Sequence, residues 1–384
     1  MAQMQVAVLE PGDPKQTQLV VQQAVDVLAG GGLVVFPTET VYGVAAAATS
    51  AQGVAALRAI KGDTAGRRPF AVHLPDPSNA GEYIDLSSGV LRRLIRRMMP
   101  GPVTLHVQVD ASVRKHKLAA LGLPRECGER IYHDDSVALR CPDHRVTRQI
   151  LLGAGVPIVA GSANLPGRRA AREAGEAASQ LGDRVELIVD GGRTRYAKPS
   201  TVVRVTGEGA SRAVRVEREG VYDERFVRKL MRWTLLIVCS GNTCRSPMAA
   251  GLARQMLAAQ RGITEQDLEA AGMSVLSAGV SAAAGMPATE EAVDVLSARG
   301  IDITDHRSRL LTPEMIHDAD VILTMTEAQR RAVLDLAPSA GEKLLPLDPQ
   351  GDISDPIGGG PASYERTAEH IQKQLEIRLR EQQP

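Results

Sequence analysis

Residues 235–247 read Leu-Leu-Ile-Val-Cys-Ser-Gly-Asn-Thr-Cys-Arg-Ser-Pro, and this stretch determines the fold of the surrounding chain. The apolar run from Leu235 to Val238 predicts a short buried strand, and the good helix formers between Met248 and Leu257 predict a helix. The polar, glycine-containing segment between them would direct backbone N–H groups toward a helix N-terminus, which attracts anions. The sequence therefore predicts a strand, an anion-binding loop and a helix in immediate succession.

Two side chains suit this loop for chemistry on phosphorus. Cys239 opens the loop and Arg245 closes it six positions later. The thiolate is the reactive form of cysteine, and a helix N-terminus favours it over the thiol. The planar guanidinium of Arg245 can hold two oxygens of a phosphoryl group. We therefore interpret Cys239 as a nucleophile rather than as a buried cysteine at a strand end.

The composition describes a globular protein of about two domains. The chain has 384 residues, of which 43% are hydrophobic and 23% charged, and only 3% are aromatic, so we expect aliphatic cores. No apolar run approaches the roughly 20 residues of a membrane span, and the first residues do not resemble a secretion signal. Four cysteines, two of them in the loop, do not make a disulfide framework. We expect a cytoplasmic protein without a membrane partner.

A formal net charge of zero conceals two oppositely charged halves. Residues 1–232 carry 32 Lys and Arg against 24 Asp and Glu, a net +8, and residues 233–384 carry 13 against 21, a net −8. A basic half can attract nucleotides or RNA, although a solvated basic face with no partner has the same composition. Charge alone leaves both interpretations open.

The first half alternates apolar runs with helical stretches, which predicts an α/β domain whose strand order the sequence does not reveal. The predicted strands are Gly32–Phe36, Ala71–Leu74, Val103–Val109, Val137–Leu139, Ile158–Ala160 and Thr201–Val205. The predicted helices are Gln18–Leu28, Ala51–Ile60, Leu91–Met99 and Ala170–Leu181. The polar stretch from Arg114 to Asp135 contains His, Gly and Pro and is interpreted as a long loop.

The second half predicts a small doubly wound parallel sheet. Three further apolar strands, Ser274–Ala278, Val321–Met325 and Lys343–Leu347, alternate with helical segments. Because a short helix over Glu224–Arg232 leads directly into the next strand, we place the domain boundary near Arg232. The predicted domains are 1–232 and 233–384.

Phosphoryl transfer to a thiolate also needs a proton donor for the leaving group. The segment from Leu347 to Pro356 offers three carboxylates, Asp348, Asp352 and Asp355. Asp355 precedes Pro356 and three glycines, so its side chain could move over a bound anion. We therefore favour Asp355 as the general acid over the other two, which could also belong to solvated turns.

Residues 233–384 resemble the low-molecular-weight protein tyrosine phosphatase family along their whole length. The motifs that carry the resemblance are the loop 239–246, Ser277-Ala278-Gly279, Asp305-His306-Arg307-Ser308 and Asp355-Pro356. It implies that Cys239 is the nucleophile, Arg245 binds phosphate and Asp355 is the general acid and base. It implies that the phosphate-binding and thiolate-stabilising residues are Gly241, Asn242, Thr243, Cys244 and Ser246, with no metal ion. Cys244 matches the cysteine that can form a reversible protective disulfide in this family.

The substrate can be phosphotyrosine or phosphoarginine. Tyrosine-selective members usually have aromatic residues after the Asp-Pro pair, where this chain has Ile357 and Gly358. Threonine at position 243 resembles the protein arginine phosphatase branch, so we favour a phosphoarginine protein substrate over phosphotyrosine. Thioredoxin-coupled arsenate reduction on the same fold needs two further downstream cysteines, and none follows Cys244.

The first half resembles the YrdC-like threonylcarbamoyl-AMP synthase family from about Val20 to Val221, which implies a twisted mixed-sheet α/β domain. The motifs are Gly31–Gly43, Pro100–Thr104, Arg140–His144, Ser162–Gly167 and Pro199–Val202, each a loop at a predicted strand end. The resemblance implies condensation of L-threonine, bicarbonate and ATP, with Mg²⁺, to an adenylate and pyrophosphate. The adenylate would serve modification of transfer RNA, so tRNA or tRNA-modification proteins are expected partners.

The resemblance also implies a set of binding residues for threonine and ATP. They are Thr38, Thr40, Tyr42, Lys61, Arg140, Ser162, Asn164 and Ser200. Thr40 and Tyr42 would lie near the amino acid, while Lys61 and Arg140 would contact phosphates or a carboxylate. Ser162 and Asn164 would bind the nucleotide and the intermediate, with Ser200 close by.

One position departs from the family pattern. The family has Lys-x-Arg where this chain has Lys61-Gly62-Asp63, and an acid there would oppose ATP binding unless Arg67 or Arg68 replaces the missing cation. The alternative function is therefore a tyrosine phosphatase joined to an inactive nucleotide- or RNA-binding regulatory domain. Cys127, His133, Cys141 and His144 lie close in sequence but have no familiar zinc spacing.

Overall fold

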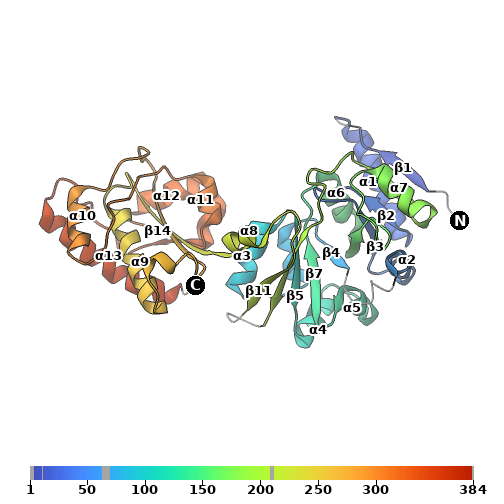
Figure 1. Ribbon diagram of the computed structural model, residues 1–384, viewed down its shortest axis with the longest axis horizontal. Helices are drawn as coiled ribbons and strands as arrows, with labels where there is room; N and C mark the ends of the chain where they lie inside the picture. The colour runs from blue at the N-terminus through green and yellow to red at the C-terminus, as the bar shows by residue number, and fades with distance from the viewer. Residues whose placement is uncertain (1–3, 11, 63–69, 208–211, 383–384) are drawn as a thin grey trace. The chain divides into compact units, whose positions relative to one another are not determined.

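The computed structural model describes residues 4–10, 12–62, 70–207 and 212–382. The chain forms two compact units, Met1–Leu230 and Met231–Pro384 (Figure 1). Asp63, Arg67 and Arg68, which decide how the Lys61 motif departs from its family, lie outside the described residues. Within those residues no helix has the length and apolar character needed to cross a membrane.

The first unit is built on one mixed sheet. Its strands are β1 (Gln5–Val8), β2 (Val34–Phe36), β3 (Gly43–Ala47), β4 (Ala71–His73), β5 (Val103–Gln108), β6 (Tyr132–His133), β7 (Ser136–Arg140), β8 (Ile158–Ser162), β9 (Leu187–Asp190), β10 (Thr201–Thr206) and β11 (Ala213–Arg218). Across the described residues the order is β1-β9-β2-β3-β8-β4-β7-β5-β10-β11, with β6 paired to β7. Parallel and antiparallel neighbours alternate irregularly along this order, which confirms the predicted mixed α/β class.

The α-helices that alternate with these strands along the chain fall within residues 14–231. They are α1 (Pro14–Ala29), α2 (Ala51–Lys61), α3 (Gly89–Met98), α4 (Ala111–Ala120), α5 (Arg125–Ile131), α6 (Arg145–Ala154), α7 (Ala174–Leu181) and α8 (Glu224–Met231). Helices α1 and α6 pack together through an aliphatic cluster that includes Leu28, Ile150 and Val189. With so few aromatic residues, branched aliphatic side chains and alanines fill the core.

The interpretation of Arg114–Asp135 as a loop is wrong. Helices α4 and α5 and the short strand β6 occupy most of this stretch. Asp110 caps α4, its carboxylate accepting the Ala111 N–H at 3.0 Å, but α4 buries none of its side chains and so shows no apolar stripe. Its sequence therefore lacks the periodicity on which the prediction relied.

Other differences have local causes. Strands β1, β3, β9 and β11 have no counterpart among the predicted strands, and β3 is Gly-Val-Ala-Ala-Ala, which has little intrinsic strand preference. The predicted helix from Ala170 begins only at Ala174, because the Ala171 N–H bonds the carbonyl of Ala163 instead. Helix α1 begins four residues earlier than predicted, at Pro14.

The second unit contains a parallel sheet in the order β13-β12-β14-β15. The strands are β12 (Trp233–Cys239), β13 (Met273–Gly279), β14 (Val321–Thr324) and β15 (Leu344–Pro346). The helices are α9 (Arg245–Arg261), α10 (Glu290–Ser297), α11 (Pro313–Asp318), α12 (Glu327–Leu336) and α13 (Pro361–Glu381). Helix α9 begins three residues before Met248, where the helix was predicted to start.

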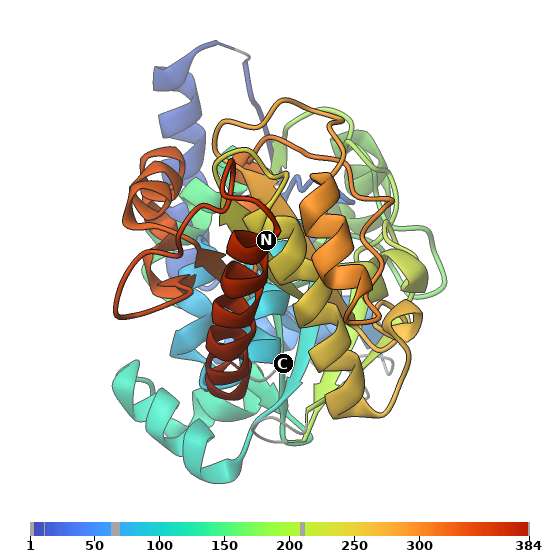
Figure 2. The same cartoon turned by 90° about the vertical axis from the view of Figure 1, so that its left-hand side faces the viewer.

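Successive residues of β12 face opposite layers of helices. Leu235 and Ile237 belong to the cluster that contains residues of α9, α10 and α13, whereas Leu236 and Val238 belong to the cluster with α11 and α12. In Figure 2, α13 (dark red) and α9 (gold) cover the same side of the strands. Helices on both faces confirm the predicted doubly wound sheet and leave the carboxyl edge of the strands for a site.

We expect Leu235→Ala and Leu236→Ala each to lower the free energy of unfolding of the second unit by about 2–5 kcal/mol, because both faces of β12 are buried. Leu336→Ala, at an exposed position of α12, should change it by less than about 0.5 kcal/mol. Urea titration with hydrogen exchange of the β12 amides measures both effects. A small cost for either strand variant would contradict two-sided burial.

Candidate active sites

The loop between β12 and α9 surrounds the Cys239 sulfur with hydrogen-bond donors. Cys239 is the last residue of its strand, and its Sγ lies 2.9 Å from Ser246 Oγ. The backbone N–H of Asn242 donates to the same sulfur at 3.2 Å. These two contacts hold the sulfur in place at the carboxyl end of β12.

The buried side chain of Asn242 holds the loop in shape. Its backbone has a φ of +56°, a left-handed conformation that asparagine tolerates better than most residues. Its Nδ2 donates to Ser246 Oγ at 2.9 Å and to Ser277 Oγ at 3.0 Å, and its Oδ1 accepts from the Arg309 N–H at 2.9 Å. His306 Nε2 donates to the Asn242 carbonyl at 2.7 Å, and burial lowers the pKa of this histidine.

Gly279 lets the neighbouring strand approach the loop closely. A Cβ at this position would lie 2.3 Å from the Ser240 carbonyl oxygen and 3.0 Å from the Asn242 nitrogen. Only a residue without a side chain fits there, which gives a physical reason for the Ser-Ala-Gly ending of β13.

Arg245 joins the loop to the segment that follows β15. Its side chain is 6% exposed, its Nη1 donates to the Ile353 carbonyl at 3.1 Å, and its Nη2 pairs with Asp355 Oδ2. The Asp355 side chain is 46% exposed, so one end of this ion pair faces solvent. Cys239, Arg245 and Asp355 thus come from a strand end, a helix start and a distant loop to one edge of the sheet.

The other two candidate carboxylates have different partners. Asp348 Oδ2 accepts from His370 Nε2 at 2.7 Å, and Asp352 Oδ1 accepts from the Glu327 N–H at 2.8 Å. Among the three, Asp355 is the one that bonds Arg245.

The remaining loop residues lie around Cys244. Its buried Sγ is 3.5 Å from Tyr364 Oη and 3.5 Å from Thr243 Oγ1, while Gly241 is exposed.

Trp233 and Tyr364 are the sole Trp, Tyr or Phe residues of positions 233–384, and both are buried. No aromatic ring of this unit is therefore exposed to stack on a phenyl substrate.

In the first unit, several predicted residues line one cavity of about 540 Å³. Its walls come from β3, β4, β5, β7, β8, β10 and β11, and Tyr42, Arg140, Ser162 and Ser200 belong to them. A cavity of this volume suits a ligand of nucleotide size.

Arg140, in the wall of the cavity, bonds two threonine hydroxyls and a carboxylate. Its Nη2 donates to Thr38 Oγ1 at 3.0 Å, to Glu39 Oε1 at 3.1 Å and to Thr40 Oγ1. The Arg140–Glu39 pair is buried on both sides. The structure brings Thr38, Thr40 and Arg140 together, three residues to which the sequence assigned binding roles.

Lys61 forms a second group with Ser162 and Asn164. Its Nζ donates to the Asn164 carbonyl at 3.0 Å, to Asn164 Oδ1 at 3.1 Å and to the Ser162 carbonyl. Burial lowers the pKa of Lys61 to about 8. Its charge therefore depends on pH near neutrality.

Tyr42 and Ser200 bond the surrounding framework. Tyr42 Oη donates to the Gly192 carbonyl at 2.7 Å and accepts from the Gly191 N–H at 3.1 Å, and burial raises its pKa above the ordinary value. Ser200 Oγ lies 2.9 Å from Thr104 Oγ1.

Sequence reasoning missed part of this cavity. The additional polar wall residues are His73, Thr104, His106, Arg204, Arg215, Glu217 and Arg218. Thr104 stood inside a quoted motif without a role, and the alternation Ala-Val-Arg-Val-Glu-Arg at 213–218 could have predicted β11. Burial lowers the pKa of His73 to about 3, so its imidazole is neutral.

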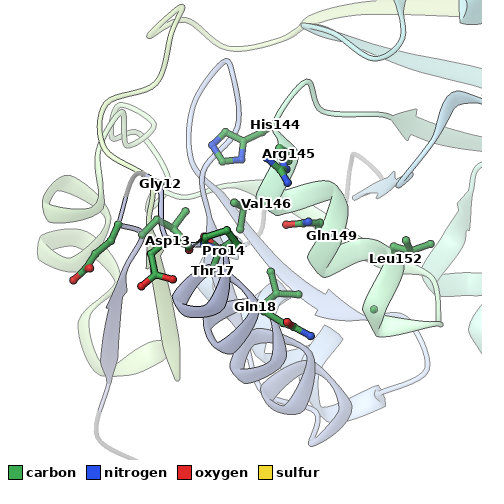
Figure 3. A pocket seen from close by; sticks show the side chains of 15 residues that line it. Gly12, Asp13, Pro14, Thr17, Gln18, His144, Arg145, Val146, Gln149 and Leu152 are labelled. Carbon is green, nitrogen blue, oxygen red and sulfur yellow. Dashed lines mark hydrogen bonds between the residues drawn. The ribbon is translucent and has the colours of Figure 1, made fainter.

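A larger cavity of about 730 Å³ contains no predicted site residue. It lies between the start of α1 and helix α6, and its labelled side chains include Asp13, His144 and Leu152 (Figure 3). The Asp13 carboxylate bonds the Lys15 and Gln16 N–H groups as the cap of α1. Because Asp13 is engaged as a helix cap, the side chains of this cavity give no indication of a ligand.

The residues considered for zinc do not form a cluster. Cys127 and Cys141 are buried free thiols, and burial raises the pKa of Cys141 to about 12. Over residues 4–10, 12–62, 70–207 and 212–382, no group of three or more His, Cys, Asp or Glu side chains could hold a metal ion.

Two family models match the chain. The Sua5/YciO/YrdC model, described as telomere recombination, matches residues 26–220. The model of the low molecular weight phosphotyrosine protein phosphatase matches residues 234–382.

Similar proteins are known for each half. A Ralstonia nicotianae protein named "Probable low molecular weight protein-tyrosine-phosphatase EpsP" is 39% identical over 142 residues, 36% of this chain and 89% of that protein. A protein-arginine-phosphatase of Geobacillus stearothermophilus is 35% identical over 147 residues, 37% of this chain and 90% of that protein. A threonylcarbamoyl-AMP synthase of Bacillus subtilis is 32% identical over 195 residues, 51% of this chain and 51% of that protein.

The first family model covers the cavity with Arg140, and the second covers the loop with Cys239. The chain belongs to the Sua5/YciO/YrdC family through its first half and to the low molecular weight phosphotyrosine protein phosphatase family through its second.

Proposed function

We propose that this chain is a bifunctional enzyme whose second unit, corresponding to residues 233–384, is a protein phosphatase acting through a phosphocysteine. The observation that supports this most directly is the convergence of Cys239, Arg245 and Asp355 at one sheet edge. Asn242 and Ser246 supply donors for the sulfur. Family membership agrees with this assignment.

In the first step, Cys239 Sγ attacks phosphorus and forms the S–P bond as the bond to the leaving group breaks. Asp355, protonated at this stage, gives its proton to the leaving atom. The phosphoryl group competes with Asp355 for the Arg245 guanidinium, so substrate binding frees the carboxyl for this transfer. In the second step Asp355 takes a proton from water, whose oxygen attacks phosphorus and releases phosphate and the thiolate.

For the substrate we propose phosphoarginine in a protein. The exposed Asp355 carboxyl already bonds one guanidinium, and the oxygen that does not carry the proton could accept an N–H of a substrate guanidinium. The buried state of Trp233 and Tyr364 removes the stacking that a phosphotyrosine ring would gain, about 0.5–1.5 kcal/mol. The similar proteins include one named for tyrosine and one named for arginine, so substrate choice needs a direct test.

We expect kcat/KM for a phosphoarginine peptide to exceed that for a phosphotyrosine peptide of the same sequence by about tenfold or more, the difference that one charged contact makes. Released phosphate measures both reactions. Cys239→Ser provides the blank, since a hydroxyl cannot replace the thiolate. Faster turnover of phosphotyrosine would overturn the assignment.

We propose that the first unit, corresponding to residues 1–232, makes threonylcarbamoyl-AMP. The amine of L-threonine takes up bicarbonate with loss of water, and the resulting carbamate oxygen attacks the α-phosphorus of ATP and releases pyrophosphate. The cavity bounded by Tyr42, Arg140, Ser162 and Ser200 supports this proposal by its size and its hydrogen-bonding groups. The product would serve tRNA modification.

Lys61 and Arg140 are the cations that we assign to phosphate or carboxylate oxygens, and Ser162 and Asn164 the polar groups for the nucleotide. Thr40 and Tyr42 are assigned to the threonine, Thr38 to threonine or ATP, and Ser200 to the cavity wall nearby. Lys61 lies among neutral carbonyl, amide and hydroxyl oxygens, whereas Arg140 bonds two threonine hydroxyls and is also paired with Glu39. A low-dielectric setting strengthens their attraction for an anion.

The carboxylates in the wall of this cavity and beside Arg140 do not fit a protein-held magnesium ion. Glu217 already accepts from Arg204 at 2.9 Å and from His106 at 3.2 Å, and Glu39 pairs with Arg140. Any Mg²⁺ would therefore arrive with the phosphates of ATP, as this ion commonly does.

We expect the full chain to release pyrophosphate from ATP only when threonine and bicarbonate are both present. Omission of either substrate is the control. If the natural chain is inactive while Asp63→Arg gains activity, the first unit is a binding module and the synthase assignment fails.

Because burial lowers the pKa of Lys61 to about 8, its charge is present below pH 8 and is lost as the pH rises through this value. We expect KM for ATP to rise about tenfold between pH 7 and pH 9.5, the cost of one charged contact. Lys61→Arg stays charged over this range and should remove the rise. An identical pH profile for both proteins would show that Lys61 does not contact ATP.

A further inference from the structure

The segment that carries Asp355 is fixed upstream of this residue. We call residues 347–360, between β15 and α13, the acid loop. Its backbone pairs with β14 and its continuation, the Leu347 N–H bonding the Thr324 carbonyl at 2.8 Å and the Ile353 N–H the Met325 carbonyl at 2.7 Å. The Ile353 carbonyl in turn accepts from Arg245.

Asp352 ties the acid loop to the start of α12. Its Oδ1 accepts the N–H of Glu327, the first residue of that helix, at 2.8 Å. This N–H has no partner within the helix, and a carboxylate there also gains from the helix dipole. The contact lies three residues before Asp355.

The same turn of α12 also holds the nucleophile loop. The buried Gln329 accepts the N–H groups of Met325 and Thr326 at 3.0 and 3.1 Å. Its Nε2 donates to Ser240 Oγ, next to Cys239, at 3.1 Å. One helical turn is thus bonded to both loops whose side chains must meet at the phosphoryl group.

Asp348 holds the beginning of the acid loop on α13. Its side chain is 10% exposed, accepts from His370 Nε2 at 2.7 Å and accepts the Gln350 N–H at 2.8 Å. Burial alone would raise the pKa of Asp348, but these two donors outweigh it and hold the pKa below the ordinary value. Its carboxylate is therefore charged and engaged.

The side chains of residues 356–360, which follow Asp355, form no hydrogen bond or ion pair among the described residues, although Pro356 itself is buried. Pro356 is followed by Gly358, Gly359 and Gly360, and Gly358 and Gly360 have positive φ. The position of the Asp355 carboxyl therefore depends on its bond to Arg245, on the buried Pro356 and on the upstream contacts.

We propose that Asp352 and Asp348 are positioning residues that keep the Asp355 carboxyl within reach of the leaving group. This inference rests on the proposed phosphatase mechanism, in which Asp355 supplies the proton. Removing an anchor lets the acid loop shift, while the Cys239 sulfur keeps its hydrogen bonds to Ser246 and Asn242. Proton donation weakens, and attack on phosphorus does not.

Two substrates of the full chain separate these steps. p-Nitrophenyl phosphate has a leaving group that is stable as an anion, whereas phenyl phosphate needs the proton. We expect Asp355→Asn to lower kcat for phenyl phosphate by about 100-fold or more and for p-nitrophenyl phosphate much less. We compare kcat for phenyl phosphate with kcat for p-nitrophenyl phosphate as a ratio. This ratio should fall by about tenfold in Asp352→Ala and in Asp348→Ala, with KM nearly unchanged.

Matched variants separate positioning from loss of stability. The amide oxygen of Asp352→Asn can still accept the Glu327 N–H, so this variant should restore most of the ratio. Asp267→Ala removes a carboxylate that accepts from Thr264 Oγ1 at 2.7 Å in a different part of the second unit, and its ratio should stay unchanged. The melting temperature of each variant shows whether a lower kcat results from lost stability instead.

The outcomes distinguish the inference from the mechanism beneath it. Suppose that Asp355→Asn slows phenyl phosphate more than p-nitrophenyl phosphate. If Asp352→Ala and Asp348→Ala then slow both substrates equally, or slow neither, the positioning roles are wrong and the phosphatase mechanism stands. If Asp355→Asn itself is not selective, Asp355 is not the general acid, and both fail.

Discussion

The buried amide of Asn242 connects the parts of the phosphatase site. An amide removed from water is costly unless its donors and acceptors are satisfied, and here they bond Ser246, Ser277 and Arg309. These partners belong to α9, to β13 and to the segment after His306. The loop conformation therefore requires the neighbouring strand and that segment to be in place, and the donors to the Cys239 sulfur exist only when the whole unit is folded.

The cavity of the first unit also depends on a buried polar side chain, in this case a charged one. The guanidinium of Arg140 is buried against Glu39 and two threonine hydroxyls. A buried ion pair contributes little net stability, and its loss on one side is strongly destabilising. Such a pair is suited to a ligand site, because an incoming anion meets a cation that is already held in position.

The sequence predicted the centre of each site better than its periphery. The strand, loop and helix around Cys239 were predictable because apolar run, glycine loop and helix formers are adjacent, and Asp355 was distinguished by its Pro-Gly context. The partners of Asp348 and Asp352 were not, since His370 and Glu327 are brought near by tertiary folding. For the same reason β11, which pairs with β10, and its Arg215 and Glu217 escaped prediction, and β3 is a strand through pairing on both edges rather than through its glycine and alanines.

Trp233, the sole tryptophan of the chain, is buried at the first residue of β12. Its indole therefore belongs to the phosphatase unit, and the first unit contributes only tyrosine and phenylalanine to the ultraviolet emission. Excitation at the red edge of the protein absorption band would report on one half of the chain alone. The two units can then be followed as separate optical signals within one intact polypeptide, without labels or truncation.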